Sequence, residues 1–246
     1  MRGKSYINDR VKVAASETVG DVISFEMFRD DKKRFHCVAD KDRRTAVAAA
    51  RKEGDTREMF VINFIGPNPP YPHGVVTIAM NEEEEKKNGK NLQFWKLWRR
   101  FVDAESDEWR NNRFKVRLRV PGSFIVTNKF QADRLYLTRS SLLKVIPNIF
   151  EGAWVVSSAV GNTPALLGNK LKQSYFKGDG YFELDCDVGS SSVASWLVHL
   201  IQSYSTQLKI DLAFTIQGNS EDELPEKICG ALRLCHLDID AIPFVV

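Results

Sequence analysis

Short apolar and alternating runs, separated by turn-forming residues, recur along the chain. Residues 21–29 alternate between apolar and polar side chains, which predicts a β-strand with at least one buried face. Residues 59–67 form an apolar run that is typical of a buried strand. Residues 75–80 predict a strand that returns antiparallel to it, because the prolines within residues 68–74 form a rigid turn between the two.

Two segments have the periodicity of helices. Residues 91–104 place large apolar side chains on one broad face, which predicts an amphipathic helix. Residues 190–208 predict a helix with so wide an apolar face that we expect it to be mostly buried. The charged residues 81–90 indicate a solvated loop, and residues 30–58 a solvated loop with one short alanine-rich helix.

The second half of the chain continues this mixture. Residues 171–189 carry a hairpin signal, in which two alternating runs are joined by residues 178–180 with two glycines that tolerate positive φ. A helix is expected at residues 223–232, with Pro225 in its first turn. Further strands are expected at residues 113–120, 122–130, 134–146, 209–218 and 233–242.

Strands and helices alternate to the end of the chain without an internal repeat or a linker rich in glycine and serine. A single α+β domain over residues 1–246 is therefore predicted. We expect a curved, mainly antiparallel sheet packed against the helix of Trp95 and the helix of Trp196. An apolar content of 43% supports a substantial core in a chain of 246 residues.

Charge and cysteine usage narrow the functional classes. Lysine and arginine number 35 against 32 for aspartate and glutamate, a balance too even to indicate a nucleic-acid partner. The N-terminal residues lack a secretory signal, and no run approaches the roughly 18 apolar residues of a membrane span. The four cysteines form no CxxC pair, which favours reduced thiols over a zinc site. We therefore expect an intracellular protein, cytoplasmic or peripherally attached to a membrane.

Glu183, Asp185 and Asp187 alternate with apolar residues and so share one face of a strand. Three carboxylates in this arrangement can hold a divalent cation or contact a polar ligand. They can also pair with the basic residues 115–119 or with Lys172. A solvated or salt-bridged sheet face is the favoured interpretation, and no metal site is predicted.

A run of serines follows the acidic strand, at the start of the predicted helix of residues 190–208. Free N–H groups there, with the hydroxyls of Ser190 and Ser191, can accept an anion such as a lipid phosphate. Self-capping by serine satisfies the same donors without a ligand and is the favoured interpretation.

The helix at residues 91–104 combines tryptophans with basic side chains. Trp95 and Trp98 beside arginines suit the boundary between acyl chains and anionic headgroups. Packing of the helix over the sheet is the favoured alternative, and a role as the wall or lid of a cavity is a third. If the helix meets a membrane, the contacting residues are Lys96, Arg99 and Arg100.

No catalytic signature is present in the sequence. The four histidines lie far apart, and His199, within an apolar helix, is expected to be a hydrogen-bonded core residue. Motifs of the GxSxG, HExxH and cysteine–histidine kinds are absent. We therefore expect a protein that is not an enzyme and that uses no cofactor.

A set of short motifs in the second half has an order and spacing that identify a family. The motifs include Glu151–Trp154, Val160–Pro164, Leu166–Gly168, Tyr181–Ser191, Asp211–Phe214 and Glu223–Glu226. With them, the segment from Phe150 to Ile239 resembles the C-terminal domain of the plant enhanced disease resistance 2 family, long known as a domain of unknown function. Looser matches in the first half are Tyr6–Ile7, Phe60–Asn63, Phe101–Asp103 and Arg113–Lys115.

The resemblance covers nearly the whole chain and implies this domain alone, with a less family-like basic insert at about residues 116–143. In plant members the domain usually follows a pleckstrin-homology domain and a START lipid-binding domain, neither of which this sequence contains. The resemblance implies membrane-linked or lipid-linked regulation, with no established enzymatic activity.

These observations predict non-catalytic binding, transfer or sensing of a lipid or other hydrophobic ligand at a membrane surface. The expected site is a START-like hydrophobic cavity between sheet and helices, with Ser190 and Ser191 near the ligand. The candidate wall residues are Trp95, Trp98, Trp154, Trp196 and Phe214. The alternatives are a regulatory module that binds a protein partner and a metal-dependent enzyme that uses the acidic strand.

Overall fold

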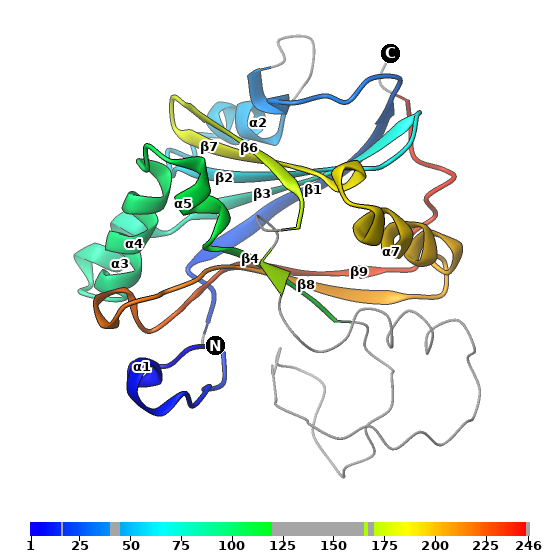
Figure 1. Cartoon of the computed structure of the whole chain (residues 1–246). Coiled ribbons are helices and arrows are strands. Elements are labelled where there is room, and N and C mark those ends of the chain that lie inside the picture. Colours follow the sequence, from blue (N-terminus) through cyan, green and yellow to red (C-terminus); the bar gives the residue numbers. More distant parts are fainter. Residues whose placement is uncertain (16, 40–44, 120–164, 167–169, 245–246) are drawn as a thin grey trace.

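Two β-sheets face each other in the computed structural model of the chain, which describes residues 1–15, 17–39, 45–119, 165–166 and 170–244 (Figure 1). The predicted α+β class is confirmed, and most strand pairs are antiparallel as expected. The expectation of one sheet is wrong. Sequence periodicity marks strands but does not say which strands pair, so it does not reveal the division into two sheets.

The larger sheet contains β1 (Gly20–Asp30), β3 (Tyr71–Met80), β2 (Met59–Ile65), β7 (Tyr181–Asp187) and β6 (Lys172–Gly178), in that order. Its neighbouring strands are antiparallel, except that β2 and β7 run parallel. The smaller sheet is antiparallel throughout, in the order β5 (Ala165–Leu166), β4 (Phe114–Arg119), β8 (Lys209–Ile216) and β9 (Ile228–Cys235). The hairpin predicted at residues 171–189 is confirmed as β6 and β7.

Helices cover the edges of this two-sheet arrangement (Figure 1). Helix α4 closes one end of the space between the sheets and α7 the other, while α2 covers the outer face of the larger sheet. The bounds are α1 (Tyr6–Asp9), α2 (Ala46–Lys52), α3 (Glu82–Lys87), α4 (Leu92–Val102), α5 (Asp107–Asn111) and α7 (Ser192–Ser203). Short 3₁₀ turns are η1 (Cys37–Ala39), η3 (Val188–Ser190) and η4 (Glu221–Glu223). The strands predicted at residues 122–130 and 134–146 lie outside the described residues, as does most of the basic insert.

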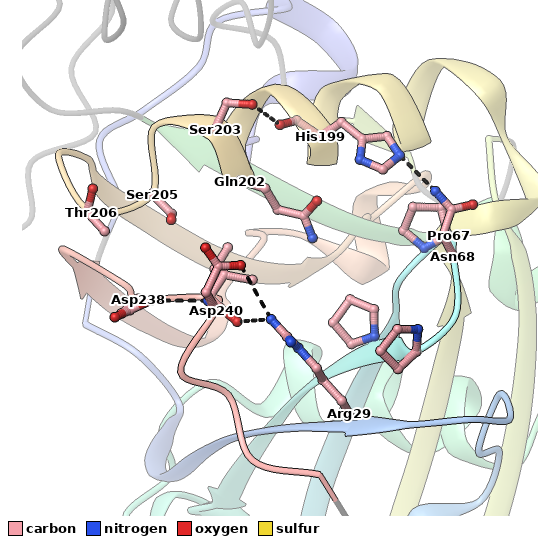
Figure 2. Close-up of a pocket in the computed structure, with 13 residues that line it drawn as sticks. Arg29, Pro67, Asn68, His199, Gln202, Ser203, Ser205, Thr206, Asp238 and Asp240 are labelled. Carbon is pink, nitrogen blue, oxygen red and sulfur yellow. Dashed lines mark hydrogen bonds and ion pairs between the residues drawn. The ribbon is translucent and has the colours of Figure 1, made fainter.

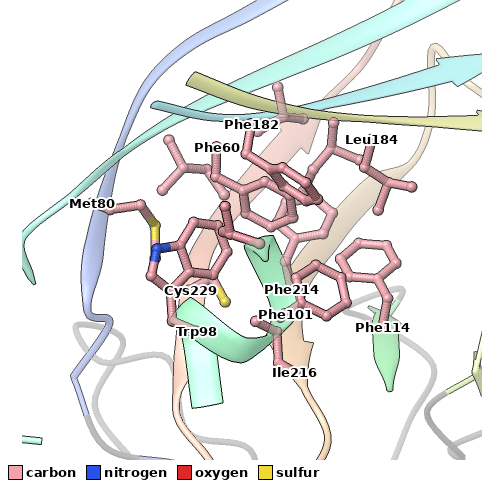
Figure 3. Close-up of a cluster of buried hydrophobic side chains, with 14 of the residues drawn as sticks. Phe60, Met80, Trp98, Phe101, Phe114, Phe182, Leu184, Phe214, Ile216 and Cys229 are labelled. Atoms are coloured by element: carbon pink, nitrogen blue, oxygen red, sulfur yellow. The ribbon is translucent and has the colours of Figure 1, made fainter. Parts of the chain in front are cut away.

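Aromatic rings fill the space between the sheets (Figure 3). The Phe60 ring of β2 meets Trp98 of α4 edge-on, with 5.1 Å between ring centroids, and meets Phe114 of β4 at 6.0 Å. Phe182 of β7 meets Phe101 of α4 at 5.7 Å. All five side chains are fully buried. Edge-to-face contacts of this kind add to the hydrophobic stabilisation that burial of each ring provides.

The larger sheet is buried on both faces. Met59, Val61 and Val75 point away from the aromatic core and pack beneath Val47 and Ala50 of α2. Two-sided burial explains why β2 is an almost unbroken apolar run in the sequence. The alanine-rich helix predicted within residues 30–58 is confirmed as α2, capped by the Thr45 hydroxyl.

Three local predictions are wrong. The strand predicted at residues 233–242 ends at Cys235, the last residue of β9. The charged residues 81–90 are not a loop but contain α3, whose first turn is acidic and whose last turn is basic, a distribution that stabilises a helix dipole. Residues 223–232 do not form a helix, because Ile228–Cys235 pair with β8 as strand β9. Pairing in the smaller sheet and burial of Cys229 in the aromatic core outweigh the local helical pattern.

The fold predicts very different costs for removing two tryptophans. Trp98 is fully buried and donates its indole N–H to Glu58 Oε2 over 2.8 Å, whereas the side chain of Trp196 is 55% exposed. We expect Trp98→Ala to lower the free energy of unfolding by about 3–5 kcal/mol, and Trp196→Ala by about 1 kcal/mol or less. Urea denaturation followed by circular dichroism measures both, and equal losses would contradict the packing described above.

Candidate functional site

A polar cavity of about 460 Å³ lies where α7, the end of β1 and the C-terminal segment meet (Figure 2). Its walls are Arg29 of β1, the proline-rich turn at residues 67–72, the second half of α7, Ser205 with Thr206, and residues 238–240. A cavity of this volume suits a small molecule or a ligand headgroup. These residues come from four stretches of the chain that are far apart in the sequence, and no motif links them.

Arg29 is held in the wall of this cavity by the backbone on both sides of β1. In the sheet it lies opposite Pro72 of β3, and its own N–H donates to the carbonyl oxygen of Pro243 over 2.8 Å. Its guanidinium Nη2 donates to the carbonyl oxygen of Ile239 and lies 3.6 Å from the Asp240 carboxylate. The Asp240 side chain is fully exposed to solvent.

The opposite wall belongs to α7. Asn68 Nδ2 lies 3.1 Å from His199 Nε2 and joins the proline-rich turn to the helix. The Gln202 side chain projects into the space between α7 and Arg29 (Figure 2). Because His199 is exposed, its expected place in the core is wrong.

Helix α7 is amphipathic, with one face packed and one face open. Its inner face contributes Ala194 and Val198 to the aromatic core and contacts a small cluster around Leu208 and Ile210. Its outer stripe begins with Val193 and Trp196, whose side chains are 74% and 55% exposed, and continues with the cavity residues His199 and Ser203. The expectation of a mostly buried helix is wrong, since no α7 residue is buried. The helix lies at the end of the two-sheet arrangement and touches it with one side only.

The structure places most predicted wall residues away from this cavity. Trp95, Trp98 and Phe214 are fully buried in the aromatic core, where neighbouring side chains pack around them. Trp95 also donates its indole N–H to Glu85 Oε2 over 2.9 Å. Trp196 is exposed, and Trp154 lies outside the described residues.

The predicted membrane-contact residues of α4 fall into two kinds. Lys96 is exposed to solvent. Arg99 is ion-paired with Glu82 and, over 3.1 Å, with Glu58. Arg100 is ion-paired with buried Glu223 over 2.9 Å and lies 3.8 Å from Asp222. Acidic neighbours therefore offset the charge of both arginines.

The predicted serine cap is confirmed. Ser191 Oγ accepts the N–H of Ala194 in the first turn of α7. Ser190 Oγ accepts the N–H of Lys172 over 2.7 Å and donates to the carbonyl oxygen of Asp187 over 2.6 Å. Both hydroxyls are thus used within the fold, and they tie the start of β6 to the start of α7.

The acidic strand β7 fixes a neighbouring loop in place. Glu183 and Asp185 are completely buried, and their carboxylates accept backbone N–H groups of residues 36–38. Asp187 is ion-paired with Lys33 over 2.8 Å. The favoured interpretation of a solvated or salt-bridged face is therefore wrong for Glu183 and Asp185, which are buried against backbone N–H groups. Of the alternative partners at residues 115–119, Lys115 is ion-paired with Glu226. The three carboxylates thus attach residues 33–38 to the sheet.

Further polar groups complete this buried network. Asn63 of β2 donates its amide to Asp185 over 2.9 Å and, through its oxygen, contacts His73 Nδ1 at 3.1 Å. His36 stacks on Phe176, with 4.4 Å between ring centroids. Among the residues that the structure describes, no group of three or more histidine, cysteine, aspartate or glutamate side chains is arranged to hold a metal ion.

Burial gives this network a dependence on pH. Burial and the nearby Asp185 carboxylate raise the pKa of Glu183 to about 8, and burial raises the pKa of Asp185 to about 6. The folded state therefore holds these protons more tightly than the unfolded state does. The stability that they contribute is complete below the ordinary carboxylate pKa of about 4 and is lost as the pH rises toward 8.

Glu183→Gln tests this origin, because an amide keeps an oxygen for the loop while it stays neutral at every pH. We expect the melting temperature of the wild-type protein to fall more than that of Glu183→Gln between pH 5.5 and pH 8.5, since each kcal/mol lost lowers it by about 2–4 °C. Scanning calorimetry across this range measures the difference. Glu83→Gln, at an exposed position of α3, is the control and should follow the wild-type protein. Parallel curves for wild type and Glu183→Gln would contradict the assignment.

Comparisons with known proteins agree with the sequence motifs. The family model described as "Protein ENHANCED DISEASE RESISTANCE 2, C-terminal" matches residues 1–133 and 127–238. A protein of Arabidopsis thaliana, named "Protein ENHANCED DISEASE RESISTANCE 2-like", is 31% identical over 241 residues, which are 98% of this chain and 28% of that protein. No solved structure matches the chain. The chain belongs to the enhanced disease resistance 2 C-terminal family.

Proposed function

We propose that this domain is a non-catalytic module that binds lipid at an intracellular membrane surface, with α7 as the contacting element. The observation that carries the proposal is the outer stripe of α7. Exposed Val193 and Trp196 form its first half, and the second half lines a polar cavity. An exposed tryptophan beside a polar site suits the boundary between acyl chains and headgroups.

Positive charge near the start of α7 supports membrane contact through this helix. Lys170 and Lys172 are exposed at the beginning of β6. The hydrogen bond from the Lys172 N–H to Ser190 Oγ holds that end of β6 against the start of the helix. Exposed lysines close to a membrane surface attract anionic lipids, each by about 1 kcal/mol.

The aromatic helix α4 is less suited to the same task. Its tryptophans belong to the core, and Arg99 and Arg100 already face carboxylates. Within the described parts of the chain, no helix has the length and apolar character to cross a bilayer. The proposal therefore requires only peripheral contact through α7. The four cysteines are free thiols, in keeping with an intracellular compartment.

Vesicle co-sedimentation tests the role of Trp196. We expect wild-type protein to bind vesicles that contain phosphatidylserine, and Trp196→Ala to weaken that binding about tenfold, because the exposed indole supplies much of the inserted apolar area. Leu92→Ala, which removes an exposed apolar side chain at the start of α4, is the matched control and should bind like wild type.

Two results of this experiment would contradict the proposal. One is wild-type protein that stays in the supernatant at every lipid composition. The other is an equal loss of binding in Trp196→Ala and Leu92→Ala. If vesicles are ignored while the Val193–Trp196 face holds another protein, the alternative of a regulatory protein–protein module would take its place.

A further inference from the structure

We propose that the cavity around Arg29 is a binding site for a phosphate ester, with Arg29 as the residue that holds the phosphate. The inference rests on the proposed function in one respect, since we expect the phosphate to belong to the headgroup of a lipid bound at α7. A free phosphate ester carries the same chemistry, and the experiment below separates the two sources.

The guanidinium of Arg29 has donors to spare. Its Nη2 contacts Ile239 and Asp240, while Nε and Nη1 make no hydrogen bond to any residue that the structure describes. The group reaches into the cavity from the end of β1 (Figure 2). Arginine presents such donors in a planar fork that matches two phosphate oxygens. Backbone pairing on both sides of β1 fixes the position of this fork before a ligand arrives.

Neutral donors lie across the cavity from Arg29. The Gln202 amide projects from α7 and makes no hydrogen bond within the described residues. The Thr206 hydroxyl lines the same space. Asn68 donates to His199 Nε2, so a neutral His199 keeps its proton on Nδ1. A phosphate with a hydroxylated substituent can therefore be contacted by arginine on one side and by amide and hydroxyl groups on the other.

Asp240 is the group that an incoming phosphate would replace. Its carboxylate lies 3.6 Å from Arg29, yet its side chain is fully exposed and can turn into solvent. Asp238, by contrast, is fixed, because its Oδ1 accepts the N–H groups of Asp240 and Ala241. Removal of the Asp240 charge should leave the cavity intact and favour an anion beside Arg29.

The cavity also lies in the right place for a lipid. His199 follows Trp196 by three residues and so lies on the same stripe of α7. A phosphate at Arg29 would leave acyl chains free to run toward Trp196 and Val193. Proline rings of the turn at residues 67–72 give the cavity a rigid wall on the side of β3.

Isothermal titration with sn-glycerol 3-phosphate tests whether the cavity binds a free phosphate ester. We expect Arg29→Gln to weaken binding at least tenfold, since a charge-assisted fork is lost, and Asp240→Asn to strengthen it about threefold. Arg233→Gln is the matched control, because Arg233 is also a partly exposed arginine paired with one carboxylate, and it should bind like wild type. Asp240→Asn keeps the test decisive if Arg29→Gln loosens the C-terminal segment.

Vesicles of phosphatidylcholine with phosphatidic acid provide the lipid arm. Loss of binding in both Arg29→Gln and Trp196→Ala supports a lipid phosphate as the ligand. If the protein binds sn-glycerol 3-phosphate, Arg29→Gln weakens that binding and vesicles are not bound, the result supports the phosphate site and contradicts the proposed membrane function. Vesicle binding that Trp196→Ala removes and Arg29→Gln leaves unchanged overturns the site but not the membrane function. Absence of binding in both arms overturns the site.

Discussion

Packing of aromatic rings between the two sheets is the constraint on which the rest of this structure depends. Phe60, Trp98 and Phe182 contact one another edge-on or at a tilt, and each is fully buried. Since these rings fill the space that they enclose, a ligand has no room among them. The polar cavity around Arg29 lies instead at the end of the arrangement, where α7 touches the sheets with one face and leaves the other open.

Polar groups buried on β2 and β7 of the larger sheet hold a loop in place. Glu183, Asp185 and Asn63 carry no exposed surface, and each makes a hydrogen bond with the loop at residues 33–38. Burial without such partners would cost several kcal/mol per group, so the loop and the acidic strand depend on each other. The network therefore belongs to the architecture. It lies apart from the cavity, whose lining shares none of these residues.

Sequence patterns predicted the local elements well and the site poorly. The apolar run of residues 59–67 and the hairpin of residues 171–189 depend on short-range periodicity and turn chemistry, and both are confirmed. The helix at residues 223–232 is wrong because sheet pairing with β8 decides its structure. Arg29 and Gln202 could not have been brought together from sequence, since they are far apart along the chain and belong to no motif. The sequence predicts a buried α7 because a wide apolar helical face has the same sequence pattern whether a neighbouring element covers it or solvent does. The exposed stripe of α7 is therefore visible only in the structure.

We propose that ligand contact occurs at the α7 end of the domain and not at the tryptophan helix α4. Hydrogen–deuterium exchange with and without vesicles of phosphatidylcholine and phosphatidic acid tests it most directly, because it reports on each segment of the same protein. We predict slower exchange in α7 and in the turn at residues 67–72, with α4 unchanged. Slower exchange confined to α4, or no change in any described segment, would contradict the account.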